Sequence, residues 1–488
     1  MLKREGMIAS LMMIFFSAGA ASASPEQFQT QVSGKIDSLL ALPEIASANC
    51  GVAVYSFQQD RFLYEKNSHK LFVPASNLKL VTTAAGLHFL GENFQFKTEF
   101  YYTGQIKKGK LEGDLIVKGY GDPTISNRFG GTVTGILEQW ADSLKTYGID
   151  AIQGKILADD SYFDSVGLGP GWSWDDISYW YGAEVSALNF NDNCVNLYFK
   201  PGREVGAPAE IRFEPETDFI QWQNLTVTSP AGSDNNLDFY RQPYSNRVTF
   251  YGSCPLNHTE WEEEYVSVNR PSRFCAHILQ EVLKEKQIEV KPEKGKSSPY
   301  AKTLLFTWRS HPLSEIVAVI NKRSQNLYAE CLLKTLGKKI KDQGSFAAGA
   351  TVLGEFLVNA GILPDQFKIY DGSGLSYLNL LSPYAVVKLL AFVHTQPQPY
   401  FRSFYESLAI PGEDKSVITR MNGVEGKEKM RLKTGLIGNA ICLSGYISDK
   451  AGELYAVSIM FNNYDTTKQK LWEIQDRICQ LIANYSDR

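Results

Sequence analysis

A serine and a lysine lie three residues apart where an apolar helix is expected to begin. The stretch Pro74-Ala75-Ser76-Asn77-Leu78-Lys79 runs into residues 80–87, which carry no charge. Proline often precedes a helix start, and residues three apart on a helix share one face. A serine hydroxyl attacks well only when a neighbouring base takes its proton, and a desolvated lysine can do so. Ser76 and Lys79 are therefore a candidate nucleophile and base, although an isolated Ser-x-x-Lys also fits an ordinary helix start.

A Lys-Thr-Gly tripeptide follows much later, on an expected strand. Lys433 and Thr434 offer a cation and a hydroxyl suited to a substrate carboxylate. We expect Gly435 to leave room for a ligand backbone to approach the strand. The backbone N–H of Leu436 could join the N–H of Ser76 in holding an oxyanion. We predict that these four strand residues bind substrate.

Three Ser-x-Asn sequences could supply a third motif, at residues 233–235, 267–269 and 324–326. The first two fall inside a predicted insertion, where they fit turn chemistry. The third lies between two expected helices of the α/β portion. We therefore assign Ser324 and Asn326 to the catalytic group.

Together these residues suggest a mechanism of acyl transfer. Ser76 attacks a carbonyl, and neutral Lys79 takes its proton. A free lysine has a pKa of about 10.4, so the pKa of Lys79 must be lowered by desolvation and by the nearby charge of Lys433. Ser324 can relay a proton to the leaving amine, and Asn326 can hold Lys79 or the substrate amide.

The elements that must position these residues lie at both ends of the chain. A hairpin is expected from Cys50 to Lys66, and three consecutive strands at 430–434, 440–447 and 453–461. We predict that they form one five-stranded antiparallel sheet. Helices at 26–42 and near the carboxyl terminus show helical apolar spacing and would cover it. The predicted class is α/β (α+β).

A large, mainly β insertion separates the first motif from the second. Strands are expected at 94–102, 110–118 and 152–157, and the aromatic cluster within 167–181 is interpreted as packing under a long loop. A helix from Pro271 to Lys286 is expected to close this part. The predicted domains are a catalytic domain (24–92 and 302–488), an inserted β-rich domain (93–168 and 271–301) and a second domain nested within it (169–270).

Composition and the first residues limit the class of protein. The chain has 488 residues, 44% of them hydrophobic and 21% charged, which is typical of a globular protein of several domains. Its net charge of -4 argues against a nucleic-acid partner. Residues 1–23 form a predicted signal peptide, with a basic start, an apolar run and Ala21-Ser22-Ala23 at the cleavage point. No later stretch is long and apolar enough to span a membrane, so we expect a soluble, exported protein.

The seven cysteines and six histidines are widely scattered. Export permits disulfides, and a bridge between Cys194 and Cys254 is one expectation. The chain contains no Cys-x-x-Cys and no His-x-x-x-His. We therefore predict no metal site, no cofactor and no histidine-based catalytic triad.

The three motifs resemble those of serine penicillin-binding proteins of the penicillin-binding protein 4 type, which are exported D-alanyl-D-alanine carboxypeptidase/endopeptidases. Further segments share the resemblance, which covers nearly all of the mature chain: residues 119–123, 159–163, 326–330, 371–376 and 443–446. The large insertion between the first two motifs is also typical of this group. The resemblance implies a transpeptidase-like catalytic domain, a periplasmic location, peptidoglycan stem peptides ending in D-Ala-D-Ala as substrate, and acylation by β-lactams.

One departure and two alternatives bear on this interpretation. Leu436 stands where the family usually has a hydroxyl residue, so a side-chain contact is lost while the backbone N–H is kept. A β-lactamase or esterase could use the same residues, but it needs fast deacylation and no carboxylate base is evident. A non-catalytic cell-wall binding protein on the same fold is the other alternative, and the intact motifs argue against it.

Overall fold

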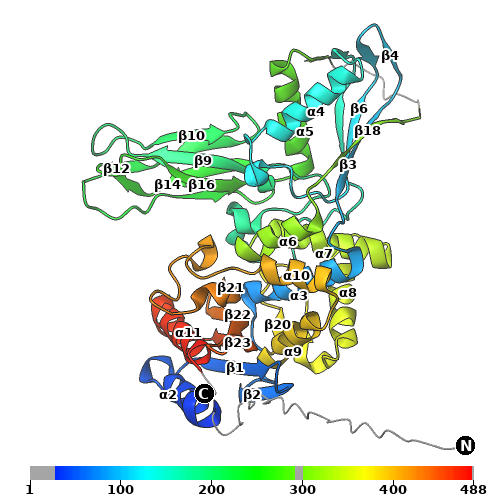
Figure 1. Ribbon diagram of the computed structural model, residues 1–488. Helices are drawn as coiled ribbons and strands as arrows, with labels where there is room; N and C mark the ends of the chain where they lie inside the picture. Colours follow the sequence, from blue (N-terminus) through cyan, green and yellow to red (C-terminus); the bar gives the residue numbers. More distant parts are fainter. Residues whose placement is uncertain (1–27, 292–300, 486–488) are drawn as a thin grey trace, which may run out of the picture.

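A five-stranded antiparallel sheet brings the two ends of the chain together (Figure 1). In the computed structural model, which describes residues 28–291 and 301–485, the strand order is β2-β1-β23-β22-β21. The strands are β1 (Asn49–Ser56), β2 (Arg61–Lys66), β21 (Arg431–Ile437), β22 (Ala440–Ser448) and β23 (Leu454–Asn462). The predicted pairing of the first hairpin with the last three strands, and the predicted fold class, are confirmed. The predicted signal peptide lies outside the described residues.

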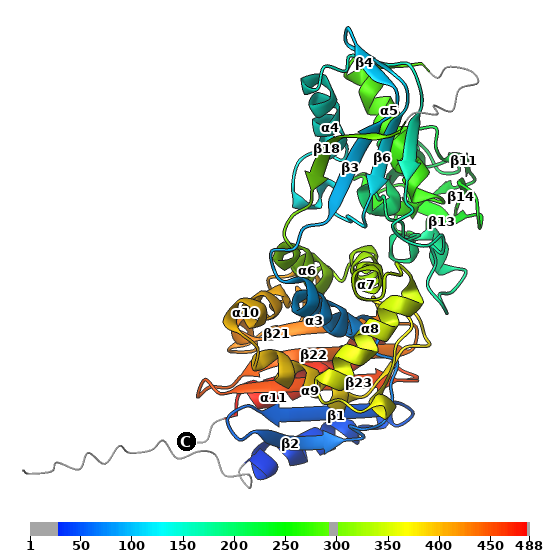
Figure 2. The ribbon, with the colours of Figure 1, turned by 90° about the vertical axis from the view of Figure 1, so that its right-hand side faces the viewer.

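Each face of this sheet is covered by its own helices, because side chains alternate along a strand. Val52 and Val54 pack with α2 and α11 on one face, whereas Ala53 and Tyr55 pack with the remaining helices on the other. Figures 1 and 2 show α11 on the opposite side of the sheet from α3, α8 and α9. The helices are α2 (Gly34–Leu40), α3 (Lys79–Leu90), α6 (Leu313–Lys322), α7 (Asn326–Lys341), α8 (Phe346–Asn359), α9 (Pro383–His394), α10 (Gln398–Ser407) and α11 (Lys468–Ala483).

The chain leaves the domain of the five-stranded sheet after α3 and returns through a strand paired with the first strand of the insertion. β18 (Thr303–Arg309) runs antiparallel to β3 (Lys97–Tyr102). Two four-stranded sheets, β18-β3-β6-β8 and β17-β7-β5-β4, pack around two helices. The other elements are β4 (Gln105–Lys107), β5 (Lys110–Glu112), β6 (Leu115–Gly119), α4 (Gly135–Thr146), β7 (Ala151–Ile152), β8 (Ile156–Asp159), α5 (Pro271–Glu285) and β17 (Glu289–Val290).

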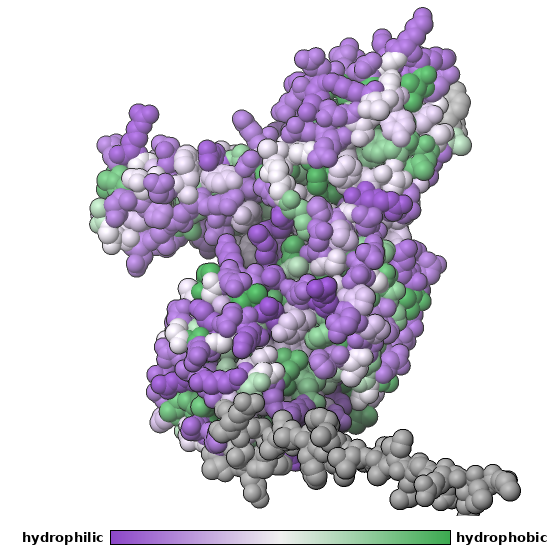
Figure 3. Space-filling view, in the orientation of Figure 1, coloured by the Kyte–Doolittle hydropathy of each residue, from purple (hydrophilic) through white to green (hydrophobic). Residues whose placement is uncertain are grey.

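A second β module is nested between β8 and α5 and projects sideways in Figure 1. Its sheets have the orders β10-β9-β16, β11-β14-β13 and β12-β15. The space-filling view shows a largely hydrophilic face, hollowed where this module overhangs the catalytic domain (Figure 3). The strands are β9 (Cys194–Lys200), β10 (Glu210–Glu214), β11 (Gln221–Asn224), β12 (Val227–Ser229), β13 (Asp238–Arg241), β14 (Arg247–Tyr251), β15 (Ser253–Pro255) and β16 (Glu262–Ser267).

Several details differ from the sequence-based expectations. The single strand predicted at 110–118 is two strands in different sheets, because the chain turns at Gly113-Asp114, where Asp114 accepts a hydrogen bond from the backbone of Lys155. Helix α4 was not predicted. The expected Cys194–Cys254 bridge is wrong: both thiols are free and buried, and Cys194 donates instead to the carbonyl oxygen of Asp192 at 3.4 Å. Within the described residues, no helix combines the length and apolarity needed to cross a bilayer.

Candidate active site

Ser76 and Lys79 meet across one tight helical turn. The residues Ala75–Leu78 form a 3₁₀ turn, and Lys79 is the first residue of α3. A 3₁₀ turn has three residues per turn, so side chains three apart come directly together. The Nζ of Lys79 lies 2.8 Å from the Oγ of Ser76. The predicted contact between Ser76 and Lys79 is therefore present, in a 3₁₀ turn that is tighter than the α-helix that was expected.

The surroundings of Lys79 favour the neutral amine. Its side chain is fully buried, and burial lowers its pKa to about 7, while the charges of Glu330 and Asp371 oppose this shift. Its Nζ donates to Asn326 Oδ1 at 2.6 Å and to the carbonyl oxygen of Ser373 at 2.7 Å. A neutral amine has two hydrogens and one lone pair. Two acceptors therefore leave the lone pair free to take the proton of the Ser76 hydroxyl.

The Ser373 carbonyl is held in place by a loop built around two buried carboxylates. Asp371 accepts hydrogen bonds from four N–H groups, those of Gly374, Ser376, the Asn379 side chain and the Trp172 indole, at 2.7–2.9 Å. Glu330 accepts from the backbone of the same loop, and burial together with the charge of Asp371 raises its pKa to about 8.

Gly374 fixes how close this loop comes to the nucleophile. Its φ of +83° lies in the left-handed region, and a Cβ built there would fall 1.9 Å from the carbonyl oxygen of Ala75. Only a residue without a side chain fits this approach. The loop and the turn that carries Ser76 are therefore in direct backbone contact.

Asn326 is oriented from outside the catalytic domain. Its Nδ2 donates to the carbonyl oxygen of Tyr181 at 2.8 Å, which leaves its Oδ1 to face Lys79. Tyr181 belongs to the aromatic loop at the start of the nested insertion, in the 3₁₀ turn Trp180–Gly182. Ser324, two residues before Asn326, has a φ of +58°. A non-glycine residue in this region is strained, and such strain concentrates at functional sites.

Strand β21 forms the opposite wall of the site. Lys433 is fully buried, and its Nζ donates to Ser324 Oγ at 3.0 Å and to the carbonyl oxygen of Thr434 at 2.8 Å. Burial holds the pKa of Lys433 well below its usual range, and the charge of Lys79 lowers it further. For Lys79, burial lowers the pKa as expected, whereas the charge of Lys433, which was also expected to lower it, is not among the causes.

The absence of a side chain at Gly435 also matters within the protein itself, in addition to the ligand approach that was predicted. A Cβ at this position would lie 2.8 Å from the carbonyl oxygen of Pro74 and 3.2 Å from the Cβ of Ala75. The missing side chain thus lets β21 approach the turn that carries Ser76. Leu436, the next residue, is 44% exposed on the edge strand of the sheet.

The two other Ser-x-Asn sequences lie in the nested module. Asn235 bonds to Glu262 at 2.7 Å, and the Ser267 hydroxyl accepts from Arg241 at 3.1 Å. Both contacts are made inside the nested module. The choice of residues 324–326 is therefore the one consistent with a site beside Ser76.

The sequence of this chain is similar to those of known proteins. The sequence pattern of the D-Ala-D-Ala carboxypeptidase 3 (S13) family matches residues 32–485. The chain belongs to this family. It is similar to a D-alanyl-D-alanine carboxypeptidase of Actinomadura sp. strain R39, with 30% identity over 94% of this chain and 85% of the relative. The D-alanyl-D-alanine carboxypeptidase DacB of Haemophilus influenzae is 25% identical, and 87% of each chain is covered.

A solved structure agrees with this assignment to the S13 family. The chain is similar in fold to penicillin binding protein 4 from Haemophilus influenzae, with a TM-score of 0.79, 23% identity and coverage of 92% of this chain and 99% of that one. The resemblance read from the motifs is thereby confirmed at the level of family and fold.

Sequence reasoning missed the residues of this S13 family member that hold the site in place. Glu330, Asp371 and Ser373 were noticed as parts of shared segments, but no role was assigned to them. The link from Tyr181 to Asn326 was not anticipated either. The aromatic loop does pack as expected at Trp172, which contacts the ring of Phe346, although Trp174 is 68% exposed.

Proposed function

We propose that this protein is an exported serine D-Ala-D-Ala carboxypeptidase that works through an acyl-enzyme on Ser76. One observation carries the proposal: the Nζ of Lys79 lies 2.8 Å from Ser76 Oγ, and the pKa of Lys79 is lowered to about 7. At neutral pH, about half of the Lys79 side chains are then uncharged, and an uncharged amine is a competent general base.

In the acylation step, Ser76 Oγ attacks the carbonyl carbon between the two D-alanines. Lys79 takes the hydroxyl proton as the new C–O bond forms. The oxyanion is held by the backbone N–H groups of Ser76 and Leu436, which stabilise charge as it develops. Lys433 and Thr434 bind the terminal carboxylate of the substrate. The arriving anion favours the protonated form of Lys433, and a charged amine and a hydroxyl can both donate to a carboxylate.

In the second half of the reaction, the C–N bond breaks and D-alanine leaves. The departing nitrogen needs a proton, and Ser324 relays it from the lysine pair, since Lys433 already contacts Ser324 at 3.0 Å. Asn326 keeps Lys79 in position throughout. A water molecule then attacks the ester carbon, and Lys79 takes a proton from it. The bond from that carbon to Ser76 Oγ breaks, Lys79 returns the proton to Oγ, and the shortened peptide leaves as a carboxylate.

The same chemistry extends to two further substrates. A peptide crosslink contains an amide on the carboxyl side of a D-alanine, so endopeptidase activity needs no new catalytic group. A β-lactam presents a strained amide to Ser76 and is expected to form a stable ester. A related Haemophilus influenzae protein has been solved in complex with a β-lactam. Peptidoglycan lies outside the inner membrane, which fits the predicted signal peptide and a periplasmic location.

The test is the intact mass of the mature protein during incubation with benzylpenicillin, with Ser76→Ala alongside. We expect a stable adduct on the wild type and none on the variant. An adduct that vanishes while the drug is consumed would instead indicate a β-lactamase. If no adduct forms and D-Ala-D-Ala peptides stay uncut, the protein is a binding module. Digestion of purified crosslinked muropeptides, followed by mass spectrometry, tests the endopeptidase activity separately.

A further inference from the structure

A histidine and two carboxylates converge at the junction of the two inserted modules. His277 and Glu281 are one turn apart on α5, and Asp218 comes from the loop between β10 and β11. His277 Nε2 lies 2.8 Å from Asp218 Oδ1 and 3.1 Å from Glu281 Oε1. Among the described residues, this is the group of three such side chains whose ligand atoms all lie within 4.8 Å of one another.

The contacts of His277 involve more than one ion pair. One ring nitrogen carries at most one proton, yet two carboxylate oxygens approach it. The Nε2 atom is sealed from solvent, and it makes no hydrogen bond of good geometry to either oxygen. One ring nitrogen thus faces two carboxylates at once, as the ligands of a shared cation do.

Two of the three side chains, His277 and Glu281, are held before any ion arrives, and both neighbours of Asp218 are anchored. The ring of Phe219 packs against the rings of His277 and Phe274, at centroid distances of 5.4 and 5.1 Å. Thr217 donates to Glu281 Oε1 at 3.1 Å. These contacts fix the loop against α5. Binding would therefore require little ordering of the protein, and preorganisation of this kind favours affinity.

We propose that Asp218, His277 and Glu281 form a binding site for a divalent transition-metal ion of the zinc type. One imidazole with two carboxylates is a ligand set that zinc accepts. Tetrahedral zinc with bonds of about 2.0–2.2 Å places its ligand atoms ~3.3 Å apart, so the present separations of 2.8 and 3.1 Å need only a small widening. This site was not predicted from the sequence, because Asp218 lies far along the chain from His277 and Glu281.

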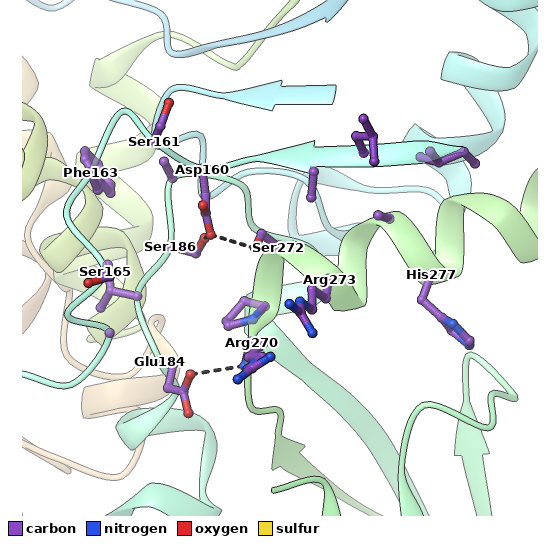
Figure 4. Close-up of a pocket in the computed structure, with 18 of the residues that line it drawn as sticks. Asp160, Ser161, Phe163, Ser165, Glu184, Ser186, Arg270, Ser272, Arg273 and His277 are labelled. Atoms are coloured by element: carbon purple, nitrogen blue, oxygen red, sulfur yellow. Dashed lines mark hydrogen bonds between the residues drawn. The ribbon is translucent and has the colours of Figure 1, made fainter. Parts of the chain in front are cut away.

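The ion would have two effects. It would fasten the loop of the nested module to α5 of the other inserted module, replacing carboxylate repulsion with coordination. It would also place positive charge at the rim of a cavity of about 900 Å³ that His277 lines together with Arg270 and Arg273 (Figure 4). Three protein ligands leave a fourth position for water or for an anionic group in that cavity.

The test uses the full mature chain without a histidine tag, stripped of metal by a chelator. Zn²⁺ is titrated in competition with a chromophoric indicator, and we expect one ion per chain. His277→Ala should weaken binding by more than ~100-fold, because even the loss of an outer-shell partner costs about 10–100-fold. Cobalt should give a visible absorption band that the variant lacks. Zinc should also raise the melting temperature of the wild type.

His258→Ala is the matched control. His258 also pairs with a glutamate four residues later, at 2.6 Å from Glu262, but within the described residues it faces no second carboxylate. Its loss should leave zinc affinity unchanged. Asp218→Asn tests the same site with little risk of misfolding, since the Asp218 side chain is 88% exposed. Failure of the wild type to bind zinc at micromolar concentration, or unchanged binding in both His277→Ala and Asp218→Asn, would overturn the proposal. Acylation by benzylpenicillin should be the same in all variants, so this outcome is separate from that of the proposed enzyme activity.

Discussion

The pH dependence of acylation tests the role of Lys79 most directly. If Lys79 is the general base, the rate constant for acylation follows the fraction of uncharged amine. With a pKa of about 7, that fraction rises from roughly a tenth at pH 6 to roughly nine-tenths at pH 8. A lysine with an ordinary pKa of about 10.4 would be uncharged in only about one molecule in 2,500 at pH 7.

We therefore expect the second-order rate constant for acylation to rise roughly tenfold from pH 6 to pH 8 and then level off. The direction follows from the sign of the shift: burial penalises the charged form, so the amine loses its proton at lower pH than in water. The assay is stopped-flow acylation by a chromogenic β-lactam at constant ionic strength. Lys79→Arg should be slower by ~1,000-fold or more, because a guanidinium is not deprotonated in this range.

A control separates Lys79 from the second buried lysine. Lys433→Arg replaces the second lysine on β21 with a group that stays charged and does not titrate in this range, so any inflection near pH 7 that survives in this variant belongs to Lys79. A flat profile, or an inflection above about pH 9, would refute the reasoning, because Lys79 would then be an ordinary cation.

Three further substitutions test the framework around the site. Gly374→Ala should abolish acylation while the protein still folds, because its Cβ would fall 1.9 Å from the Ala75 carbonyl and displace the turn that carries the nucleophile; normal acylation kinetics would contradict this. Asp371→Ala leaves three buried N–H donors and the half-buried Trp172 indole without this acceptor and should cost about 3 kcal/mol or more in chemical denaturation, with a loss of activity; an unchanged unfolding free energy would show that water replaces the carboxylate. Leu332→Ala removes a fully buried side chain from the core beneath α3 and should destabilise the protein by about 2–5 kcal/mol, whereas a cost below ~1 kcal/mol would mean that this core relaxes to fill the gap.

The sequence was informative wherever the controlling interaction is local. Ser76 and Lys79 are brought together by one helical turn, so their spacing alone predicted the contact. Alternation around Val52 and Val54 predicted β1, and three consecutive strands were expected near the end of the chain. β22 and β23 are buried along almost their whole length, as expected for strands covered on both faces. The family resemblance, carried by short motifs, was confirmed by the match over residues 32–485.

Contacts between distant segments could not be predicted from the sequence, because no local pattern of residues indicates which segments will meet. The bond from Lys79 to Asn326 joins residues 247 positions apart, and the bond from Lys79 to the Ser373 carbonyl spans 294. The close approach of Gly435 to Pro74 was not predicted for the same reason: it depends on how the turn that carries Ser76 packs against the last strands.

The sequence by itself therefore determined the chemical groups, their order and the sheet that carries them, since residue type and short-range periodicity encode these directly. Only the tertiary structure decided the state of those groups. The pKa of Lys79 depends on burial by segments from the whole chain, and the orientation of Asn326 depends on a carbonyl from the insertion. The burial of a side chain and the meeting of distant segments depend on the whole folded chain, in which residues hundreds of positions apart lie within a few ångströms of one another.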